Sequence, residues 1–405
     1  MSQVRKPLKG SESVKYTKGY LFRLYPNKEQ IILLNKTLGC SRFVFNHFLN
    51  IRKTAWEDEK KSVAYSDTSA LLTQLKADAE HLWLKEADSI ALQQSLRDLD
   101  AAYQNFFKHD RGYPKFKSKR HHRLSYRTTG KSIRVEGKKL RLPKVGAIPF
   151  VQSREFSGRI LNATVTRTAS GKYFVSLCVE DDLTNHLKVN AGDSVGLDVG
   201  LKEFCTTSQG KIIANPKILR GLSRKLARAQ RCLSRRKFDS RNRFKQRIFL
   251  ARIHERIAQT RLDFLHKLTT QLCRENQTIA VESLNIQGML KNHHLARAIS
   301  DASWGEFFRQ LQYKAFLYGC DVIKVPTFYP SSQTCSACGF QNPLVKNLSI
   351  MEWRCPKCST HHDRDTNAAI NILKKATVGH TESYACGENV RRVSAISLKQ
   401  ESLRL

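Results

Sequence analysis

Acidic residues are scarce in this 405-residue sequence, which has 35 Asp and Glu against 70 Lys and Arg and a formal net charge of +35. Such an imbalance is far from that of an ordinary soluble enzyme and predicts a large polyanion as the partner. Long apolar runs are also missing. None approaches the ~20 residues of a transmembrane helix, and the first residues lack the apolar centre of a signal peptide. Nucleic acid is therefore favoured over a membrane.

A secreted disulfide framework is absent as well. The eleven cysteines are an odd number, with seven scattered singly and four in two tight pairs. This usage predicts a reducing cytoplasm, where a protein of this charge would associate with the nucleoid.

Several common catalytic signatures are missing. The sequence has no Gly-x-Ser-x-Gly elbow, no Gly-x-x-x-x-Gly-Lys-Ser/Thr loop and no His-Glu-x-x-His. Histidines occur in pairs beside basic residues, at 121 and 122 and at 361 and 362. Without further ligands at metal spacing, these pairs are expected to contact polyanions or to lie on the surface.

The N-terminal half alternates between two patterns. A strand is predicted at 20–25, followed by a helix with Asn27 as its cap, Gln30 completing a capping box and Gly39 as its stop. A longer helix is predicted near 88–108, where apolar residues recur every three or four positions. From about 113 to 179 the pattern becomes β, with turns near Gly137 and Gly171. A β domain with a helical insertion after its first strand is expected.

The C-terminal half begins with two apolar runs typical of strands in the middle of a sheet. They are SVGLDVG at 194–200 and QTIAVES at 277–283, and each carries a carboxylate near its end, Asp198 and Glu282. Ligands of open α/β sheets gather at the carboxyl ends of strands. Taken singly, either residue could equally be a turn or edge residue.

A basic stretch, 217–261, separates these strands. It holds sixteen Lys and Arg against Asp239 and Glu255, with leucines at helical spacing, and predicts a helical hairpin. The charges could form only a solvated face. Like charges at helical neighbour positions are destabilising unless an anion offsets them, so phosphate contact is favoured. The nucleic-acid-binding candidates here are Arg235, Arg236 and Lys237.

Two Cys-x-x-Cys motifs, Cys335 with Cys338 and Cys355 with Cys358, are separated by sixteen residues. This spacing predicts a four-cysteine zinc ribbon. Four thiolates close a tetrahedral site, so the Zn²⁺ would be structural and not catalytic. A redox role for the pairs is the weaker alternative.

A third carboxylate, Asp365, precedes the amphipathic run TNAAINILKKA and could be a helix cap. Asp363 could be a solvated loop residue, and Asp301 is expected to cap the helix that follows it. If Asp198, Glu282 and Asp365 converged, they would hold two divalent cations suited to phosphodiester cleavage.

These motifs resemble the TnpB family of transposon-encoded proteins, which are related to type V CRISPR effectors. The resemblance covers about residues 18 to 375. It is carried in order by FRLYPNKEQ, GYPKFKSK, LRLPKVG, GLDVGLKEF, FLHKLTT, AVESLNI, SSQTCSACGF and HDRDTNAAINI.

The resemblance implies a multidomain α+β fold in which a β-barrel wedge domain carries a helical insertion and precedes an RNase H-like (RuvC) α/β domain with an inserted zinc ribbon. The expected parts are wedge 1–36, helical recognition domain 37–112, wedge 113–188, nuclease 189–330 with a basic hairpin at 216–275, zinc ribbon 331–361, nuclease 362–376 and a disordered tail 377–405.

The resemblance further implies RNA-guided cleavage of double-stranded DNA beside a short motif, by a monomeric protein bound to a guide RNA from the transposon end. The family's catalytic, Mg²⁺-binding acids match Asp198, Glu282 and Asp365. Positions that read the DNA motif match Tyr65, Ser69 and Gln93. Two alternatives are a transposase acting directly on transposon ends and a nuclease-silent RNA-guided repressor, against which the three intact acids count.

Overall fold

The computed structural model of the chain describes residues 15–109, 111–118, 124–182 and 192–383. The histidines at 121 and 122 and positions 384–405 of the expected tail lie outside these residues. The chain forms two compact units that divide after Asp182. No helix within the described ranges has both the length and the apolar character needed to cross a membrane.

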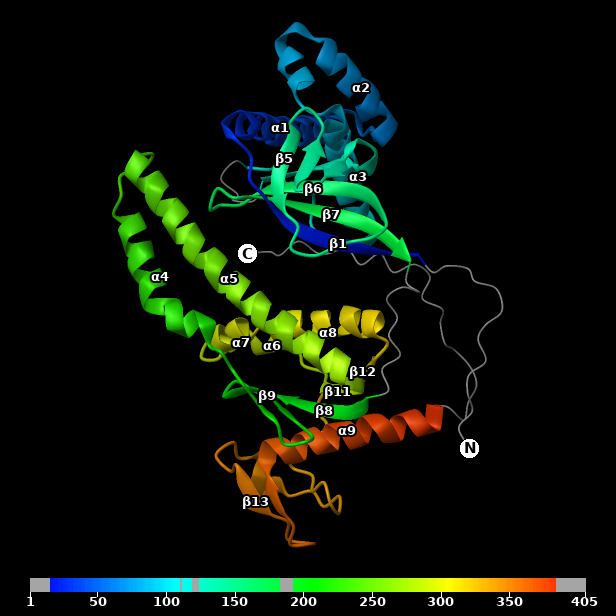
Figure 1. The fold of residues 1–405 in the computed structure, drawn as a ribbon, viewed down its shortest axis with the longest axis vertical. Coiled ribbons are helices and arrows are strands. Elements are labelled where there is room, and N and C mark those ends of the chain that lie inside the picture. The colour runs from blue at the N-terminus through cyan, green and yellow to red at the C-terminus, as the bar shows by residue number, and fades with distance from the viewer. Residues whose placement is uncertain (1–14, 110, 119–123, 183–191, 384–405) are drawn as a thin grey trace. The chain divides into compact units, whose positions relative to one another are not determined.

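An antiparallel seven-stranded sheet, a half-barrel, is the base of the N-terminal unit, with strand order β2-β6-β7-β1-β5-β4-β3. Figure 1 shows β6, β7 and β1 side by side. The strands are β1 (Lys15–Leu24), β2 (Leu124–Thr129), β3 (Arg134–Glu136), β4 (Lys139–Leu142), β5 (Gly146–Val151), β6 (Arg159–Arg167) and β7 (Tyr173–Asp182). β1 pairs with β7 along its whole length, so the first and last strands of the unit lie side by side. The turns expected near Gly137 and Gly171 are confirmed, and both glycines have positive φ.

All the long helices of this unit lie between β1 and β2, which confirms the expected helical insertion. They are α1 (Lys28–Glu59), α2 (Tyr65–Ala77) and α3 (Ser89–His109), with the 3₁₀ segments η1 (Ala79–Glu86) and, after β2, η2 (Gly130–Ser132). The apolar stripe of α3 is buried at Leu92, Leu96 and Leu99 in a core shared with α1.

Helix α1 begins as predicted, but its expected end is wrong. Asn27 Oδ1 accepts from Gln30 N at 2.8 Å and Gln30 Oε1 accepts from Asn27 N at 3.1 Å, which completes the capping box. The helix then continues through Gly39 for a total of 32 residues. Leu34 and Leu38 pack into the sheet core, whereas Val44 and its successors pack into the helical core. Burial on both sides of Gly39 overrides its low helix propensity.

Gly39 therefore offers a stabilising substitution. A Cβ built at this position meets nothing within 4 Å. Gly39→Ala should stabilise the protein by about 0.5–1 kcal/mol, because alanine loses less backbone entropy in a helix interior. The shift in the thermal unfolding midpoint measures this effect, and a lower midpoint in the variant would contradict it.

The C-terminal unit is built on a five-stranded sheet of order β10-β9-β8-β11-β12. Its strands are β8 (Asp193–Val199), β9 (Glu203–Thr207), β10 (Ile212–Ala214), β11 (Asn276–Glu282) and β12 (Asp321–Val325). β8, β9 and β10 are antiparallel to one another, whereas β11 is parallel to both β8 and β12. The carboxyl ends of β8, β11 and β12 therefore share one edge of the sheet.

Helices cover both faces of this sheet. The helices are α4 (Ile218–Ser234), α5 (Arg241–Glu275), α6 (Ile286–Met289), α7 (Ala296–Ala302), α8 (Trp304–Tyr318) and α9 (Arg364–Ser383). α5 and α8 bury one face around Phe204 and Phe307, and α9 buries the other through Ile372 and Ala376 (Figure 1). α9 also continues past Lys375, where no regular structure was expected.

A small subdomain lies between β12 and α9. It holds the 3₁₀ segment η4 (Pro343–Lys346) and the hairpin β13 (Glu352–Arg354) and β14 (His361–Asp363). Its compact core contains Cys335, Cys355, Val345 and Trp353.

Candidate functional site

Two of the three predicted acids lie side by side at the carboxyl edge of the sheet. Leu197 of β8 is opposite Val281 of the parallel strand β11. The next residue of each strand is a carboxylate, Asp198 and Glu282. The Ser331 hydroxyl donates to Glu282 Oε1 at 2.7 Å and fixes the orientation of that side chain.

The third acid reaches the same edge because of how α9 packs. Gly196 of β8 lies against the backbone of Ala369 and Leu373, with no room for a Cβ. Side chains two residues apart on a strand share a face, so Asp198 lies on this face too. Asp365 is one helical turn before Ala369, at the start of α9. The packing of α9 on β8 therefore brings Asp365 toward Asp198.

The Asp198 carboxylate lies in the electrostatic field of the other two acids. Burial raises the pKa of Asp198 well above its usual value, and the neighbouring Glu282 and Asp365 carboxylates raise it further. Burial also raises the pKa of Asp365, with Asp363 adding to the shift and Arg364 opposing it. Such crowding disfavours the ionised forms and is relieved by a bound cation.

The acids are nevertheless not closed into a cage. Among the described residues, two groups of three or more ligands have all their donor atoms within 4.8 Å of one another: the four cysteines, and a trio of Asp78, Glu80 and His81 in which both carboxylates are exposed. The three acids are not among them. Hard carboxylate oxygens nevertheless suit Mg²⁺, which keeps several of its own waters and needs few protein ligands.

The cap of α9 differs from the prediction. Asp363 Oδ1 accepts from Thr366 N at 2.8 Å, so Asp363 caps the helix, and Asp365 lies in its first turn. The two aspartates are only two residues apart, and the sequence does not show which one lies before the helix and caps it. Asp365 is thereby not engaged as the cap.

Asp301 also has a different role from the one expected. Its two carboxylate oxygens accept from Leu219 N, at 3.0 and 3.1 Å, and one of them accepts from Arg261 Nη2 at 2.9 Å. It therefore caps the start of α4 and pairs with α5, and it does not cap the helix that follows it in the chain. Lys217, which precedes α4, makes no side-chain cap bond.

The four cysteines converge as predicted. Sγ atoms of Cys335 and Cys358 are 3.6 Å apart, as are those of Cys338 and Cys355. Zn–S bonds of about 2.3 Å in a tetrahedron place sulfur atoms about 3.8 Å apart, so the four thiols fit Zn²⁺. His362, expected at the surface, is buried against Trp353, and its Nε2 lies 3.0 Å from Cys335 Sγ.

Zinc content is directly measurable. Purified protein should contain close to one zinc per chain by elemental analysis, and Cys338→Ser should lower that content. Cys232→Ser is a matched control, because Cys232 is an exposed cysteine on α4 and is not one of the four clustered cysteines. Protein without near-stoichiometric zinc would contradict the assignment.

Two asparagines of α9, which the sequence did not single out, hold the cysteine subdomain to the helix. Asn367 Oδ1 accepts from Ser336 N at 2.9 Å, and its Nδ2 donates to Thr334 O at 2.7 Å. Asn371 Nδ2 donates to Thr334 O and to Ser331 O. Ser331 is the residue that contacts Glu282, so this network joins the first cysteine knuckle to the acidic edge. The sequence gives one signal for this network: two asparagines four residues apart in the predicted helix that follows the cysteine motifs.

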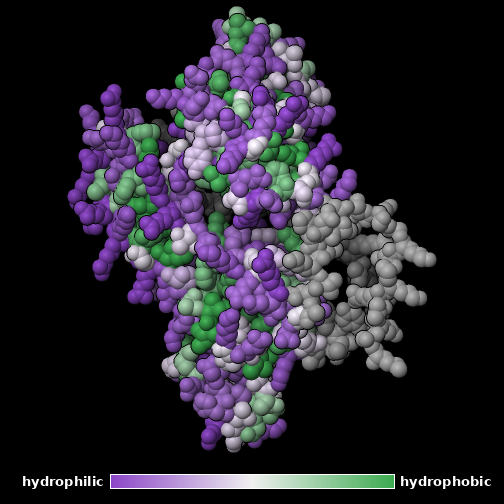
Figure 2. Space-filling view, viewed as in Figure 1, coloured by the Kyte–Doolittle hydropathy of each residue, from purple (hydrophilic) through white to green (hydrophobic). Residues whose placement is uncertain are grey.

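The predicted basic hairpin is an arm made of α4 and the first part of α5, side by side in Figure 1. Leucines and isoleucines form the seam between them. Figure 2 shows mostly hydrophilic residues on the visible surface of the arm. Arg235, Arg236 and Lys237 lie at its tip, where Arg243 Nη1 donates to Leu233 O and Arg236 O and closes the turn.

The three residues proposed to read DNA also come together. Tyr65 Oη donates to Gln93 Oε1 at 3.0 Å, and Gln93 Nε2 donates to Ser69 Oγ at 3.2 Å. Arg97, one turn after Gln93, adds a guanidinium that donates to Tyr65 Oη at 3.3 Å. α2 and α3 thus present one polar cluster. Arg97 belongs to this cluster, although the sequence did not single it out.

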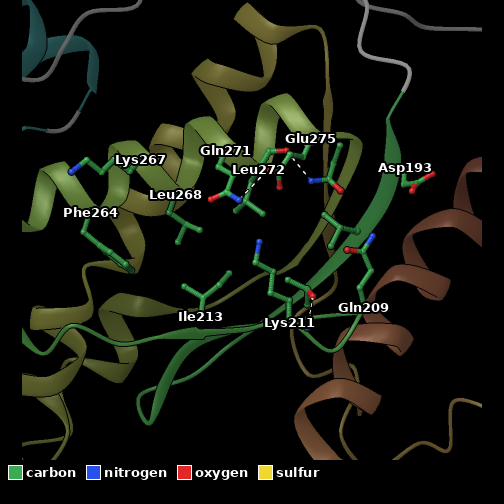
Figure 3. A pocket seen from close by; sticks show the side chains of 13 residues that line it. Asp193, Gln209, Lys211, Ile213, Phe264, Lys267, Leu268, Gln271, Leu272 and Glu275 are labelled. Atoms are coloured by element: carbon green, nitrogen blue, oxygen red, sulfur yellow. Dashed lines mark hydrogen bonds between the residues drawn. The ribbon is translucent and has the colours of Figure 1, made fainter.

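The C-terminal unit also has a cavity of 410 Å³ between α5 and the strands β8 to β10 (Figure 3). Its lining includes Asp193, the first residue of β8, so it is at the opposite end of that strand from the acidic edge. Lys211 and Gln271 also line it.

Comparison with known proteins agrees with this architecture. Three family models match: a "probable transposase" model of the OrfB_IS605 type at residues 175–293, a "Cas12f1-like, TNB domain" at 304–372 and an OrfB_IS605 "helix-turn-helix domain" at 16–61. The last region contains β1 and the single continuous helix α1.

Two relatives are named "Putative RNA-guided DNA endonuclease". The one from Streptomyces pristinaespiralis is 39% identical over 396 residues, covering 96% of each chain. The other, InsQ from Escherichia coli (strain K12), is 34% identical over 403 residues, covering 96% of this chain and 98% of InsQ.

Among solved structures, the cryo-EM structure of a Cas12f1–sgRNA–target DNA complex has a similar fold. Its TM-score is 0.54 at 13% identity, covering 89% of this chain and 99% of that one. The molecule is thus a mixed α/β multidomain protein with a Cas12f-like fold. The chain belongs to the TnpB family.

Proposed function

We propose that this protein is an RNA-guided endonuclease that cuts double-stranded DNA next to a short motif by metal-dependent phosphodiester hydrolysis. The observation that carries the proposal is the approach of Asp198, Glu282 and Asp365 to one sheet edge in a chain of charge +35. The names of the two full-length relatives support the same activity.

The nuclease part is assigned to an RNase H-like (RuvC) domain. Three antiparallel strands followed by two parallel strands, with helices on both faces, support this assignment. The cysteine subdomain at 331–361 would then be a zinc ribbon inserted ahead of the last acid. In the N-terminal unit, the change of core along α1 between Leu38 and Cys40 supports a wedge–recognition boundary near 36/37.

Asp198, Glu282 and Asp365 would hold the divalent cations, for which Mg²⁺ is the proposed species. Bound there, a metal pair supplies an activated water and stabilises the charge on the leaving oxygen. The protein's own contribution is to place the carboxylates, through the Ser331 hydrogen bond to Glu282 and the close packing of α9 on Gly196.

Recognition is divided between RNA and protein in this proposal. Base pairing with a bound guide RNA chooses the target, and the protein reads only the flanking motif. The Tyr65–Gln93–Ser69 cluster offers hydroxyl and amide groups for that reading, and Arg97 beside it can reach a base edge or a phosphate. The basic arm would contact the RNA or DNA backbone.

Sequencing the RNA that copurifies with the protein tests the proposal. A discrete RNA from the transposon end is expected, and changing its guide segment should redirect the DNA cut. Copurification of no specific RNA, together with cutting confined to transposon ends, would instead support a transposase. A specific RNA that directs DNA binding without cleavage would support a nuclease-silent repressor.

Salt dependence tests the arm. The affinity for non-target nucleic acid should fall steeply with salt, because each phosphate contact releases counterions and contributes about 0.7–0.9 to the log–log slope. Replacing Arg235, Arg236 and Lys237 with alanine should therefore reduce the slope by about 2–3. Exchanging Arg for Lys and Lys for Arg at these positions keeps the charge and should keep the slope. An unchanged slope in the alanine variant would exclude these residues as contacts.

A further inference from the structure

Phe328 is an unusual residue in the connection between β12 and the first cysteine pair. The residue is 96% exposed, more than any other exposed large hydrophobic residue in the described ranges. Its backbone has φ +72°, in the left-handed region. A bulky L-residue is a genuine outlier in this region, which is normally occupied by glycine or asparagine.

Hydrogen bonds on both sides hold the segment that carries Phe328. Before it, Thr327 Oγ1 donates to Ser283 O at 3.0 Å. After it, Ser331 Oγ donates to Glu282 Oε1 at 2.7 Å, and Ser331 O accepts from Asn371 Nδ2 at 2.8 Å. The segment is therefore anchored to Glu282, to the residue after it and to α9.

Tyr329, the neighbour of Phe328, is partly buried. Tyr329 packs against the core between the sheet and α9, and its N donates to Pro326 O at 3.3 Å to close a tight turn. With Tyr329 directed inward and both flanks fixed, the Phe328 ring is directed away from the core. The fold thus holds an apolar ring in water, in a backbone conformation that costs about 1–3 kcal/mol.

This cost indicates that the ring is covered when the protein works. Strained residues cluster at active and binding sites. Of the two residues that anchor this segment, Ser331 binds the carboxylate of the proposed metal ligand Glu282, and Thr327 binds the carbonyl of the next residue, Ser283. The partner at that edge is a nucleic-acid strand in the proposed function. The planar partner that a nucleic acid offers an aromatic ring is a base face.

We propose that Phe328 stacks on an unpaired base of the DNA strand being cut, next to the phosphate held at Asp198, Glu282 and Asp365. This inference rests on the proposed function and adds a positioning residue to it. Both faces of a base inside a duplex are covered by its neighbours, so the ring would act on a strand already separated. Stacking tolerates any base sequence because every base has a π face. It would fix the register of the strand without selecting its sequence.

Three variants separate stacking from folding. Phe328→Ala should slow cleavage by roughly five- to 150-fold, the factor expected for losing one base–aromatic stack. Phe328→Trp keeps a stacking ring and should retain cleavage. Phe328→Gly relieves the backbone conformation, so it should raise the unfolding midpoint and yet cleave as slowly as the alanine variant. Leu348→Ala is the control, because Leu348 is also an exposed apolar residue, 77% exposed, within the cysteine subdomain.

An altered substrate identifies the contact. Removing the base at the stacked nucleotide should slow cleavage by the unaltered protein. The same abasic strand should not slow Phe328→Ala further, because this variant has already lost the stack. The alanine variant should also distribute its cuts over neighbouring phosphates. Equal rates for Phe328→Ala and the unaltered protein, or an equal abasic effect in both, would overturn the inference.

A binding measurement keeps this inference separate from the nuclease assignment. In the absence of divalent cations, single-stranded DNA should quench the tryptophan fluorescence of Phe328→Trp more than that of the unaltered protein. Duplex DNA should not quench the fluorescence of the added tryptophan. If the unaltered protein cuts no DNA, the proposed function fails while this measurement still reports stacking. If cutting is normal but the tryptophan is not quenched, only the role of Phe328 fails.

Discussion

Replacing Asp198 with alanine should reduce Mg²⁺-dependent DNA cleavage by at least about a thousandfold while leaving RNA and DNA binding intact. Asp198 is on the central strand of the sheet, and its carboxylate lies near both Glu282 and Asp365. Losing it should remove about 4 kcal/mol of metal-supplied transition-state stabilisation. Single-turnover cleavage and gel-shift binding, with the same RNA-loaded protein, measure the two effects.

Asp193→Ala is the matched control, since Asp193 begins the same strand, is exposed and lies at its opposite end. It should cleave normally. Asp198→Asn, which keeps the shape but not the charge, should be as inactive as the alanine variant. Comparable cutting by either Asp198 variant would remove Asp198 from the proposed metal site.

Asp198→Asn should not destabilise the metal-free protein. Asp198 is a carboxylate in a partly buried position among other carboxylates, so the fold tolerates it at an energetic cost. Thermal unfolding of Asp198→Asn in the presence of a chelator should show a midpoint at least as high as that of the unaltered protein. A clear decrease would indicate a structural role for the carboxylate.

Gly196→Ala should destabilise the C-terminal unit by about 3 kcal/mol and greatly reduce cleavage. A Cβ at Gly196 would overlap the carbonyl oxygen of Ala369 and lie 3.0 Å from Leu373 N, and both are backbone atoms of α9. Overpacking of this kind forces backbone shifts. Here the shift would move α9, and with it Asp365, away from Asp198.

Gly39→Ala makes the same chemical change inside a helix where the added methyl meets open space, and it should have the opposite effect on stability. Metal titration gives a second measurement for Gly196→Ala. The variant should need more Mg²⁺ for any residual cleavage, because the three ligands no longer approach one another. Normal cleavage and unchanged stability would contradict the packing shown between β8 and α9.

The sequence predicted well those features that depend on local patterns. Apolar runs ending in Asp198 and Glu282 form neighbouring parallel strands, and the paired cysteines converge. Both outcomes follow from periodicity or spacing that the chain itself displays. The start of α1 followed likewise from the capping box at Asn27.

Features that depend on distant contacts were not predictable in this way. Gly39 did not end α1 because residues on either side of it are buried in two different cores. Asp301 caps α4 by accepting from the N–H of Leu219, which lies 82 residues earlier in the chain. The strained backbone of Phe328 and its exposure have no sequence signal, because they result from the hydrogen bonds made by its neighbours.

The continuous helix α1 also limits how the N-terminal unit can move. At 32 residues and about 1.5 Å per residue it is about 48 Å long, and it crosses from the sheet core to the helical core without a break. A hinge at the proposed boundary near 36/37 would require several of its hydrogen bonds to break together. If Tyr65, Ser69 and Gln93 reorient toward DNA, the sheet must therefore rotate with them as one rigid body, or the short connections on either side of α2 must bend.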